Sequence, residues 1–107
     1  MSGRRVLLDE NLPTAFRLWL PGVQAVSAEY MGWKGMRNGE LVRRTIVEGF
    51  DVLVTADREL AETPRVWSPL GCVRVTSNDF ERLRISASHV ASACNAVRPG
   101  EVLVVQL

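Results

Sequence analysis

The stretch at residues 50–60, FDVLVTADREL, decides the fold. Its first half predicts a strand over Asp51–Thr55, because a run of valine and leucine is typical of parallel strands that are buried on both faces. Its second half turns polar and predicts a short helix over Arg58–Glu62. A buried strand that passes directly into a helix is the repeating unit of α/β proteins.

The same alternation of strand and helix continues on both sides of this stretch. Four more strands are predicted, over Arg5–Leu8, Val23–Val26, Cys72–Thr76 and Val102–Val105. The chain therefore predicts a small three-layer α/β/α fold with a mostly parallel sheet of four or five strands. We expect a single domain over residues 1–107, since no linker or repeat interrupts the pattern.

The helices between these strands are predicted from asparagines that can cap them. Asn11 precedes a helix that Pro21 and Gly22 end, and Asn38 precedes a helix over Gly39–Glu48. Asn78, with Glu81 three residues later, precedes a last helix that runs to about Arg98.

Composition narrows the possible functions. With 13 basic and 12 acidic residues the net charge is +1, which excludes a polybasic mode of nucleic-acid binding. No apolar run approaches the length of a membrane span, and the N-terminus lacks the apolar core of a signal peptide, so we expect a cytoplasmic protein without a membrane partner. Two cysteines and one histidine cannot form a structural zinc site. Any catalysis is therefore expected to rest on carboxylates.

Two carboxylates follow predicted strands directly, Asp9 after the first and Asp57 after the third. In a sheet of order 2-1-3-4-5 these strands are neighbours, and ligands bind beyond their carboxyl ends. Two carboxylates about 4 Å apart repel by roughly 4 kcal/mol at an effective dielectric constant near 20. A shared proton, an arginine or a divalent cation can relieve that repulsion, and oxygen ligands suit Mg²⁺ or Mn²⁺. The alternative is that both aspartates only cap the following helical segments.

Further candidates lie between the second and third strands. Glu40 falls in the first turn of a predicted helix, where it is either a third site carboxylate or an acid that the helix dipole favours. Trp33 and Tyr30 stand beside Lys34 and Arg37, an interleaving of aromatic and basic residues that can stack on nucleic-acid bases. Equally, Trp33 can pack against the edge of the sheet.

Four segments together resemble the small PIN-like proteins whose chains open with an LLDE(N/C)LP motif. These segments are LLDENLP at 7–13, GWKGMRNGEL at 32–41, FDVLVTADREL at 50–60 and RPGEVLVV at 98–105. The resemblance covers nearly the whole chain, although residues 61–97 match only loosely. It implies a parallel α/β nuclease fold whose acidic residues bind Mg²⁺ or Mn²⁺ and cleave RNA, as in VapC-type toxins of toxin–antitoxin pairs.

The resemblance also assigns roles to single residues. Asp9, Glu40 and Asp57 are implied as the metal-binding and catalytic acids, and Thr55 as the accompanying hydroxyl. Metal-assisted hydrolysis of a phosphodiester is the implied mechanism. The cations expected to hold the flanking phosphates of the substrate are Arg58, Arg37 and Lys34.

The implied partners are RNA, an antitoxin protein and a second copy of the chain in a homodimer. The alternative function is a catalytically inactive PIN-like binding module that acts through a protein partner. Full-length PIN nucleases carry a further acid on a helix before the strand that ends in the T-x-D pattern, here Thr55–Asp57, and this chain is too short there to supply it. A receiver-like phospho-acceptor domain is excluded, because that fold needs a lysine after its last strand and no lysine follows Lys34.

Overall fold

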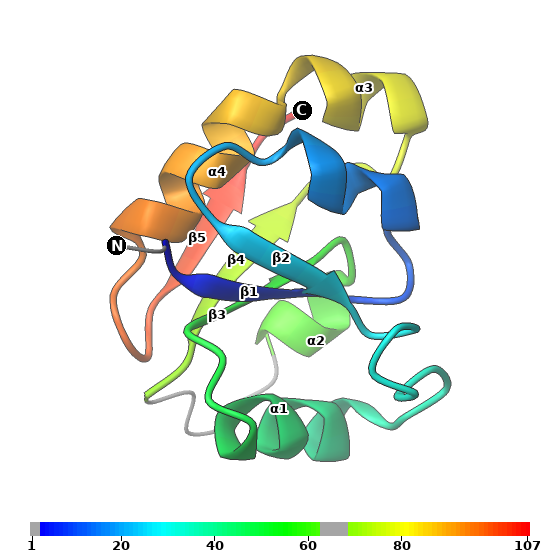
Figure 1. Ribbon diagram of the computed structural model, residues 1–107, viewed down its shortest axis with the longest axis vertical. Coiled ribbons are helices and arrows are strands. Elements are labelled where there is room, and N and C mark those ends of the chain that lie inside the picture. Colours follow the sequence, from blue (N-terminus) through cyan, green and yellow to red (C-terminus); the bar gives the residue numbers. More distant parts are fainter. Residues whose placement is uncertain (1–2, 63–68) are drawn as a thin grey trace.

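The computed structural model describes residues 3–62 and 69–107, and strands and helical segments alternate along them (Figure 1). The strands are β1 (Arg5–Leu8), β2 (Gln24–Ser27), β3 (Val52–Thr55), β4 (Gly71–Val75) and β5 (Val102–Val105). The helical segments are the 3₁₀ helix η1 (Thr14–Trp19), α1 (Asn38–Val47), α2 (Arg58–Glu62), α3 (Phe80–Ile85) and α4 (Ala87–Ala96). No helix among the described residues is long and apolar enough to cross a membrane.

The five strands form one all-parallel sheet of order β2-β1-β3-β4-β5. The predicted adjacency of the first and third strands is confirmed, with Val6 opposite Val52 and Leu8 opposite Val54. Every residue of β3 is buried, as the uninterrupted apolar run predicts. The carboxyl ends of β1 and β3 therefore lie side by side, near the middle of the row that the carboxyl ends of the five strands form.

Helices cover both faces of the sheet, which confirms the three-layer architecture (Figure 1). Side chains alternate between the faces along each strand. One face carries Val6, Val54 and Val73 and packs against η1, α3 and α4. The other face carries Leu7, Leu53 and Cys72 and packs against α1 and α2.

The predicted caps are corrected at three helices. The helix predicted after Asn11 is a 3₁₀ helix that begins at Thr14 after Pro13, without a side-chain cap. Helix α1 includes Asn38 and is preceded by Arg37, again without a side-chain cap. Helix α3 is capped by Asp79, whose carboxylate accepts from the N–H of Arg82, instead of by Asn78.

One further prediction is corrected in the C-terminal half, and the structure decides between the two alternatives for Trp33. The last helix is divided at Ser86 into α3 and α4 and ends at Ala96. Trp33 is buried against Phe50, with ring centroids 6.2 Å apart, so it packs into the core and has no free face for a base. Trp67, which the sequence also suggests as a packing residue, lies outside the described residues.

Candidate functional site

Asp9 is the first residue after β1, and it is one of few buried charged groups, with 8% of its surface exposed. Its N–H donates to the carbonyl oxygen of Val54 over 2.9 Å, which continues the ladder between β1 and β3. Its carboxylate is held at both oxygens. Oδ1 accepts from the N–H of Glu10 over 2.8 Å, and Oδ2 accepts from the hydroxyl of Thr55 over 2.7 Å.

Thr55 links the two aspartates. Its side chain is fully buried at the end of β3, on the same face of the sheet as Leu53. The hydroxyl Oγ1 donates to Asp9 and accepts from the N–H of Asp57 over 2.9 Å. One hydroxyl thus fixes the orientation of the Asp9 carboxylate and the start of the turn that carries Asp57.

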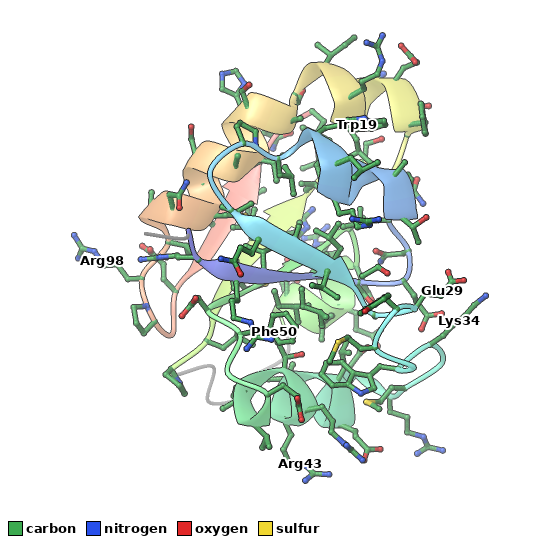
Figure 2. The ribbon with its side chains drawn as sticks, in the orientation of Figure 1. Trp19, Glu29, Lys34, Arg43, Phe50 and Arg98 are labelled. Atoms are coloured by element: carbon green, nitrogen blue, oxygen red, sulfur yellow. The ribbon has the colours of Figure 1, made fainter. Side chains whose placement is uncertain are left out.

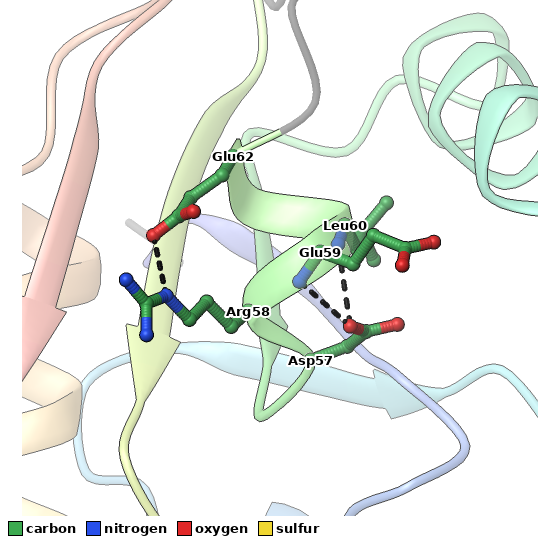
Figure 3. Close-up of polar contacts among 5 residues, drawn as sticks. All are labelled: Asp57, Arg58, Glu59, Leu60 and Glu62. Atoms are coloured by element: carbon green, nitrogen blue, oxygen red, sulfur yellow. Dashed lines mark hydrogen bonds and ion pairs between the residues drawn. The ribbon is translucent and has the colours of Figure 1, made fainter.

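Asp57 caps α2 (Figure 3). Its Oδ1 accepts from the N–H groups of Glu59 over 2.9 Å and of Leu60 over 3.3 Å. The capping alternative therefore describes Asp57 correctly. It does not describe Asp9, whose carboxylate accepts from Thr55 and from its own neighbour in the chain. Oδ2 of Asp57 has no hydrogen bond to any residue that the structure describes.

The two carboxylates form a local concentration of negative charge. Burial raises the pKa of Asp9 above its ordinary value, while the hydrogen bonds from Thr55 and Glu10 act in the opposite direction. The negative charges of Glu10 and Asp57 raise this pKa further. Within residues 3–62 and 69–107, no arginine or lysine forms an ion pair with Asp9 or Asp57. Hydrogen bonds thus stabilise the buried charge in part, but no cation among the described residues pairs with it.

Segments that follow four different strands meet around Asp9. Oε1 of Glu10 accepts from the N–H of Gly35 over 2.6 Å, which ties the segment after β2 to the site. Oδ1 of Asn11 accepts from the N–H of Ala56 over 3.4 Å, and its carbonyl oxygen accepts from Nδ2 of Asn78 over 3.4 Å. These contacts join the segments after β3 and β4. Sequence analysis missed this role of Asn11, whose only signal is its position two residues after Asp9.

Glu40 has no hydrogen bond or ion pair with Asp9, Thr55 or Asp57. It pairs with Arg43 one turn along α1, with 3.2 Å between Oε2 and the guanidinium nitrogen, and both side chains are about half exposed or more. Among the described residues, no three acidic, histidine or cysteine side chains are grouped closely enough to hold a metal ion together. The structure therefore links Asp9, Thr55 and Asp57 of the implied set by hydrogen bonds, and these hydrogen bonds do not include Glu40.

The three predicted phosphate-binding cations are all exposed. Nε of Arg58 donates to Oε2 of Glu62 over 2.8 Å, one turn along α2 (Figure 3). Lys34 and Arg37 lie on the segment between β2 and α1, which is tied to the site through Glu10. Figure 2 shows Lys34 pointing away from the body of the protein. An exposed cation on such a segment is free to contact a large polyanion.

The oxygen atoms around Asp9 are suitable ligands for a hard divalent cation. Carboxylate oxygens from Asp9 and Asp57 and the hydroxyl of Thr55 are the ligand types that Mg²⁺ and Mn²⁺ prefer, and no sulfur or imidazole lies among them. Oδ2 of Asp57 is available, and each Asp9 oxygen, with one hydrogen bond, keeps a further lone pair. An uncompensated buried carboxylate beside a second carboxylate fits a site that a cation would complete.

Comparisons of the chain with protein-family models, with curated proteins and with solved structures find no match.

Proposed function

We propose that the protein is a metal-dependent, PIN-like endoribonuclease whose Mg²⁺ or Mn²⁺ is held by Asp9 and Asp57. The observation that carries this proposal is the buried Asp9 carboxylate, which shares Thr55 with Asp57 and has no cationic partner among the described residues. The PIN-like resemblance of the segments around both aspartates supports the same assignment.

Each residue of the pair has a distinct task in this proposal. Asp9 supplies a carboxylate whose direction is fixed by Thr55 and by the N–H of Glu10, so the free energy cost of ordering it is met during folding. Asp57 supplies Oδ2, while Oδ1 remains on α2. A divalent cation bound there supplies a water of lowered pKa and compensates charge on the scissile phosphate.

The remaining implied residues act on the substrate side. Lys34 and Arg37 contact phosphates that flank the scissile bond, from a segment that Glu10 anchors to the site. Arg58 does the same after exchanging Glu62 for a phosphate, since an exposed ion pair is worth at most about 1 kcal/mol. Glu40 would act on a bound cation through water, because its carboxylate pairs with Arg43 and makes no direct contact with either aspartate.

The proposed setting is the cytoplasm, with an antitoxin protein and a second copy of the chain as protein partners. Cys72 and Cys94 are free and buried in separate core clusters, which suits a compartment that keeps thiols reduced. The second candidate function is an inactive binding module. It is favoured by the grouping of only two carboxylates, where three are implied.

Titration calorimetry with Mn²⁺ tests the proposal. We expect one site on the wild type and no measurable heat of binding with Asp9→Asn, which removes a charge and keeps the shape. Glu81→Gln is the matched control, since Glu81 lies on α3 and its one ion pair within the described part of the chain is with Arg84. Equal binding by Asp9→Asn, or no binding by the wild type, overturns the metal site. Binding without Mn²⁺-dependent cleavage of single-stranded RNA would leave the binding module as the function.

A further inference from the structure

Arg74 lies on β4, is half-buried, and has no ion pair with any residue that the structure describes. Its Nε atom is buried and lacks a hydrogen-bond partner among them. A buried donor without an acceptor, and a partly desolvated charge without a counter-charge, both cost free energy in the folded protein. Such groups are rare in native structures, and ligand binding is one reason for retaining them. Arg74 is therefore a candidate for a ligand contact.

Arg4 shows how this fold satisfies an arginine that serves its stability. Among the described arginines, only Arg4 and Arg74 are half-buried, and the others are exposed. Nη1 of Arg4 donates to the carbonyl oxygens of Cys94 over 3.0 Å and of Val97 over 2.5 Å. These contacts hold the carboxyl end of α4, as a basic side chain commonly does there. Arg74 has no such acceptor in the described part of the chain, so its donors are left for an acceptor from outside.

Arg74 stands beside the aspartate site. It is opposite Thr55 in the register of β3 and β4, and because side chains alternate along both strands, the two residues share one face of the sheet. That face also carries Cys72 and packs against α1 and α2. Helix α2 begins directly after Asp57 and packs on β3 and β4. Arg74 is therefore one strand away from the hydroxyl that links Asp9 to Asp57.

The outer end of the Arg74 side chain is open to solvent. Nη1 and Nη2 also lack a hydrogen-bond partner among the described residues, but unlike Nε they are not buried. On the side away from Thr55, the residue opposite Arg74 is Val104 of β5, and 48% of its surface is exposed. The sheet is thus only partly covered next to the arginine, and a ligand can reach both Nη atoms there.

The chemistry of this group selects an oxyanion. A guanidinium presents N–H donors in one plane, and two of them match two oxygens of a phosphate. Because the stem of Arg74 is partly buried, its direction is largely fixed before a ligand binds, and less entropy is lost on binding. The substrate of the proposed nuclease carries a phosphate on each side of the one that is cleaved. One of these flanking phosphates is the oxyanion that reaches the strand next to the aspartates.

We propose that Arg74 binds an RNA backbone phosphate next to the one that is cleaved, and so positions the substrate at Asp9 and Asp57. This inference rests on the proposed nuclease function and adds a positioning residue to it. Arg58 has to leave Glu62 before it can contact a phosphate, whereas Arg74 has no partner among the described residues to give up. Its charge is therefore available to the substrate without a competing ion pair.

Fluorescence anisotropy with a short, labelled single-stranded RNA tests the proposal on the full chain. All proteins carry Asp9→Asn and are measured in EDTA, so that the RNA is neither cleaved nor held by a metal. Adding Arg74→Met keeps an unbranched apolar stem and removes the charge. We expect about tenfold weaker binding at low salt, because a charge-assisted contact is lost. The slope of log Kd against log salt concentration should fall by about 0.7, the contribution of one phosphate contact on a single strand.

Two further variants show whether the effect belongs to the guanidinium of Arg74. Arg74→Lys keeps the charge without the planar donors, so the salt dependence should persist while part of the affinity is lost. Arg98→Met is the matched control, since Arg98 is exposed before β5, at the end of the sheet opposite to the aspartates. It should change neither the affinity nor the slope. RNA binding that Arg74→Met and Arg98→Met affect equally would overturn the proposal, as would an RNA that the parent protein does not bind.

Urea unfolding and Mn²⁺ calorimetry separate this role from the alternatives. Because Nε has no acceptor among the described residues, Arg74→Met should unfold at the same or a higher urea concentration than its parent. A lower midpoint with unchanged RNA affinity would make Arg74 a structural residue and overturn the proposal. With the native Asp9 restored, Arg74→Met should bind Mn²⁺ as the wild type does. If Mn²⁺ binds but RNA affinity is independent of Arg74, this inference fails and the metal site stands. If Mn²⁺ does not bind, the metal site fails, and the anisotropy measurement in EDTA still decides the role of Arg74.

Discussion

The hydroxyl of Thr55 donates a 2.7 Å hydrogen bond to the carboxylate of Asp9, although the two residues are 46 positions apart in the sequence. The same oxygen accepts from the N–H of Asp57. A single buried hydroxyl therefore connects the ends of the two central strands. Its removal affects both aspartates at once, which distinguishes Thr55 from every other residue around the site.

Replacing Thr55 by valine should destabilise the protein. The side chain keeps its shape, but Oδ2 of Asp9 and the N–H of Asp57 lose a buried partner, with an expected loss of about 1–3 kcal/mol in the free energy of unfolding. Thr55→Ser keeps the hydroxyl and is expected to lose less than half as much. Urea unfolding measures both variants. A Thr55→Val variant that is no less stable than Thr55→Ser would contradict the structural role given to the two hydrogen bonds of the hydroxyl.

The raised pKa of Asp9 makes stability depend on pH. The folded protein holds this proton more tightly than the unfolded chain, so the free energy of unfolding falls as pH rises from the ordinary pKa through the raised one. Above the raised pKa the destabilisation is constant. Asp9→Asn removes it, so this variant should be more stable than the wild type at neutral pH and should lose that advantage at acidic pH. Thermal unfolding across this pH range checks the sign.

Asp57 should show separable structural and metal-binding roles. Asp57→Ala removes the cap of α2 and is expected to cost about 1 kcal/mol, whereas Asp57→Asn retains an oxygen for the N–H groups of Glu59 and Leu60 and should cost little. Both variants should lose the increase in melting temperature that Mn²⁺ gives the wild type. If Mn²⁺ raises the melting temperature of Asp57→Asn as much as that of the wild type, Asp57 serves only as the cap of α2.

Glu40→Gln should affect Mn²⁺ binding much less than Asp9→Asn. The Glu40 carboxylate is exposed beside Arg43, so we expect its loss to change Mn²⁺ affinity by less than about tenfold, the lower end of the range for residues that act through a ligand or water. The stability of the variant should change by at most about 0.5 kcal/mol. Calorimetry that gives Glu40→Gln the same defect as Asp9→Asn would place Glu40 among the direct ligands.

The two thiols should be inert in the folded protein. Burial raises the pKa of Cys72 and of Cys94 to about 12, so the reactive thiolate is scarce at pH 8. We expect slow reaction with a disulfide reagent in buffer and rapid reaction of both thiols in urea. The raised values also mean that the folded state loses stability as pH rises from about 9 toward 12. Rapid labelling in buffer at pH 8 would contradict the buried placement of the thiols.

The centre of the sheet could be predicted from the sequence because β1 and β3 contain the continuous apolar runs VLL and VLV. Burial on both faces requires such runs, and few other structures use them at this length. The adjacency of β1 and β3, and with it the meeting of Asp9 and Asp57, follows from that topology. The caps could not be placed as well, since Asp79 and Asn78 are adjacent residues of similar capping ability.

The position of Glu40 could not be predicted from the sequence. Its place in the first turn of α1 was predicted, but the direction of an exposed side chain depends on its neighbours on the helix. Arg43 lies three residues on and attracts the carboxylate. The contacts of Asn11 and Asn78 could not be predicted either. They join loops, and the relative placement of these loops is determined only in the folded chain.

The strand order has a consequence for synthesis on the ribosome. β2 and β3 both pair with β1, β4 pairs with β3, and β5 pairs with β4, so each strand emerges after the strand that it will join. The sheet can therefore grow in the order of translation, outward from β1. Each of the four later strands finds a partner that has already been made, which shortens the time that it spends unpaired and open to aggregation.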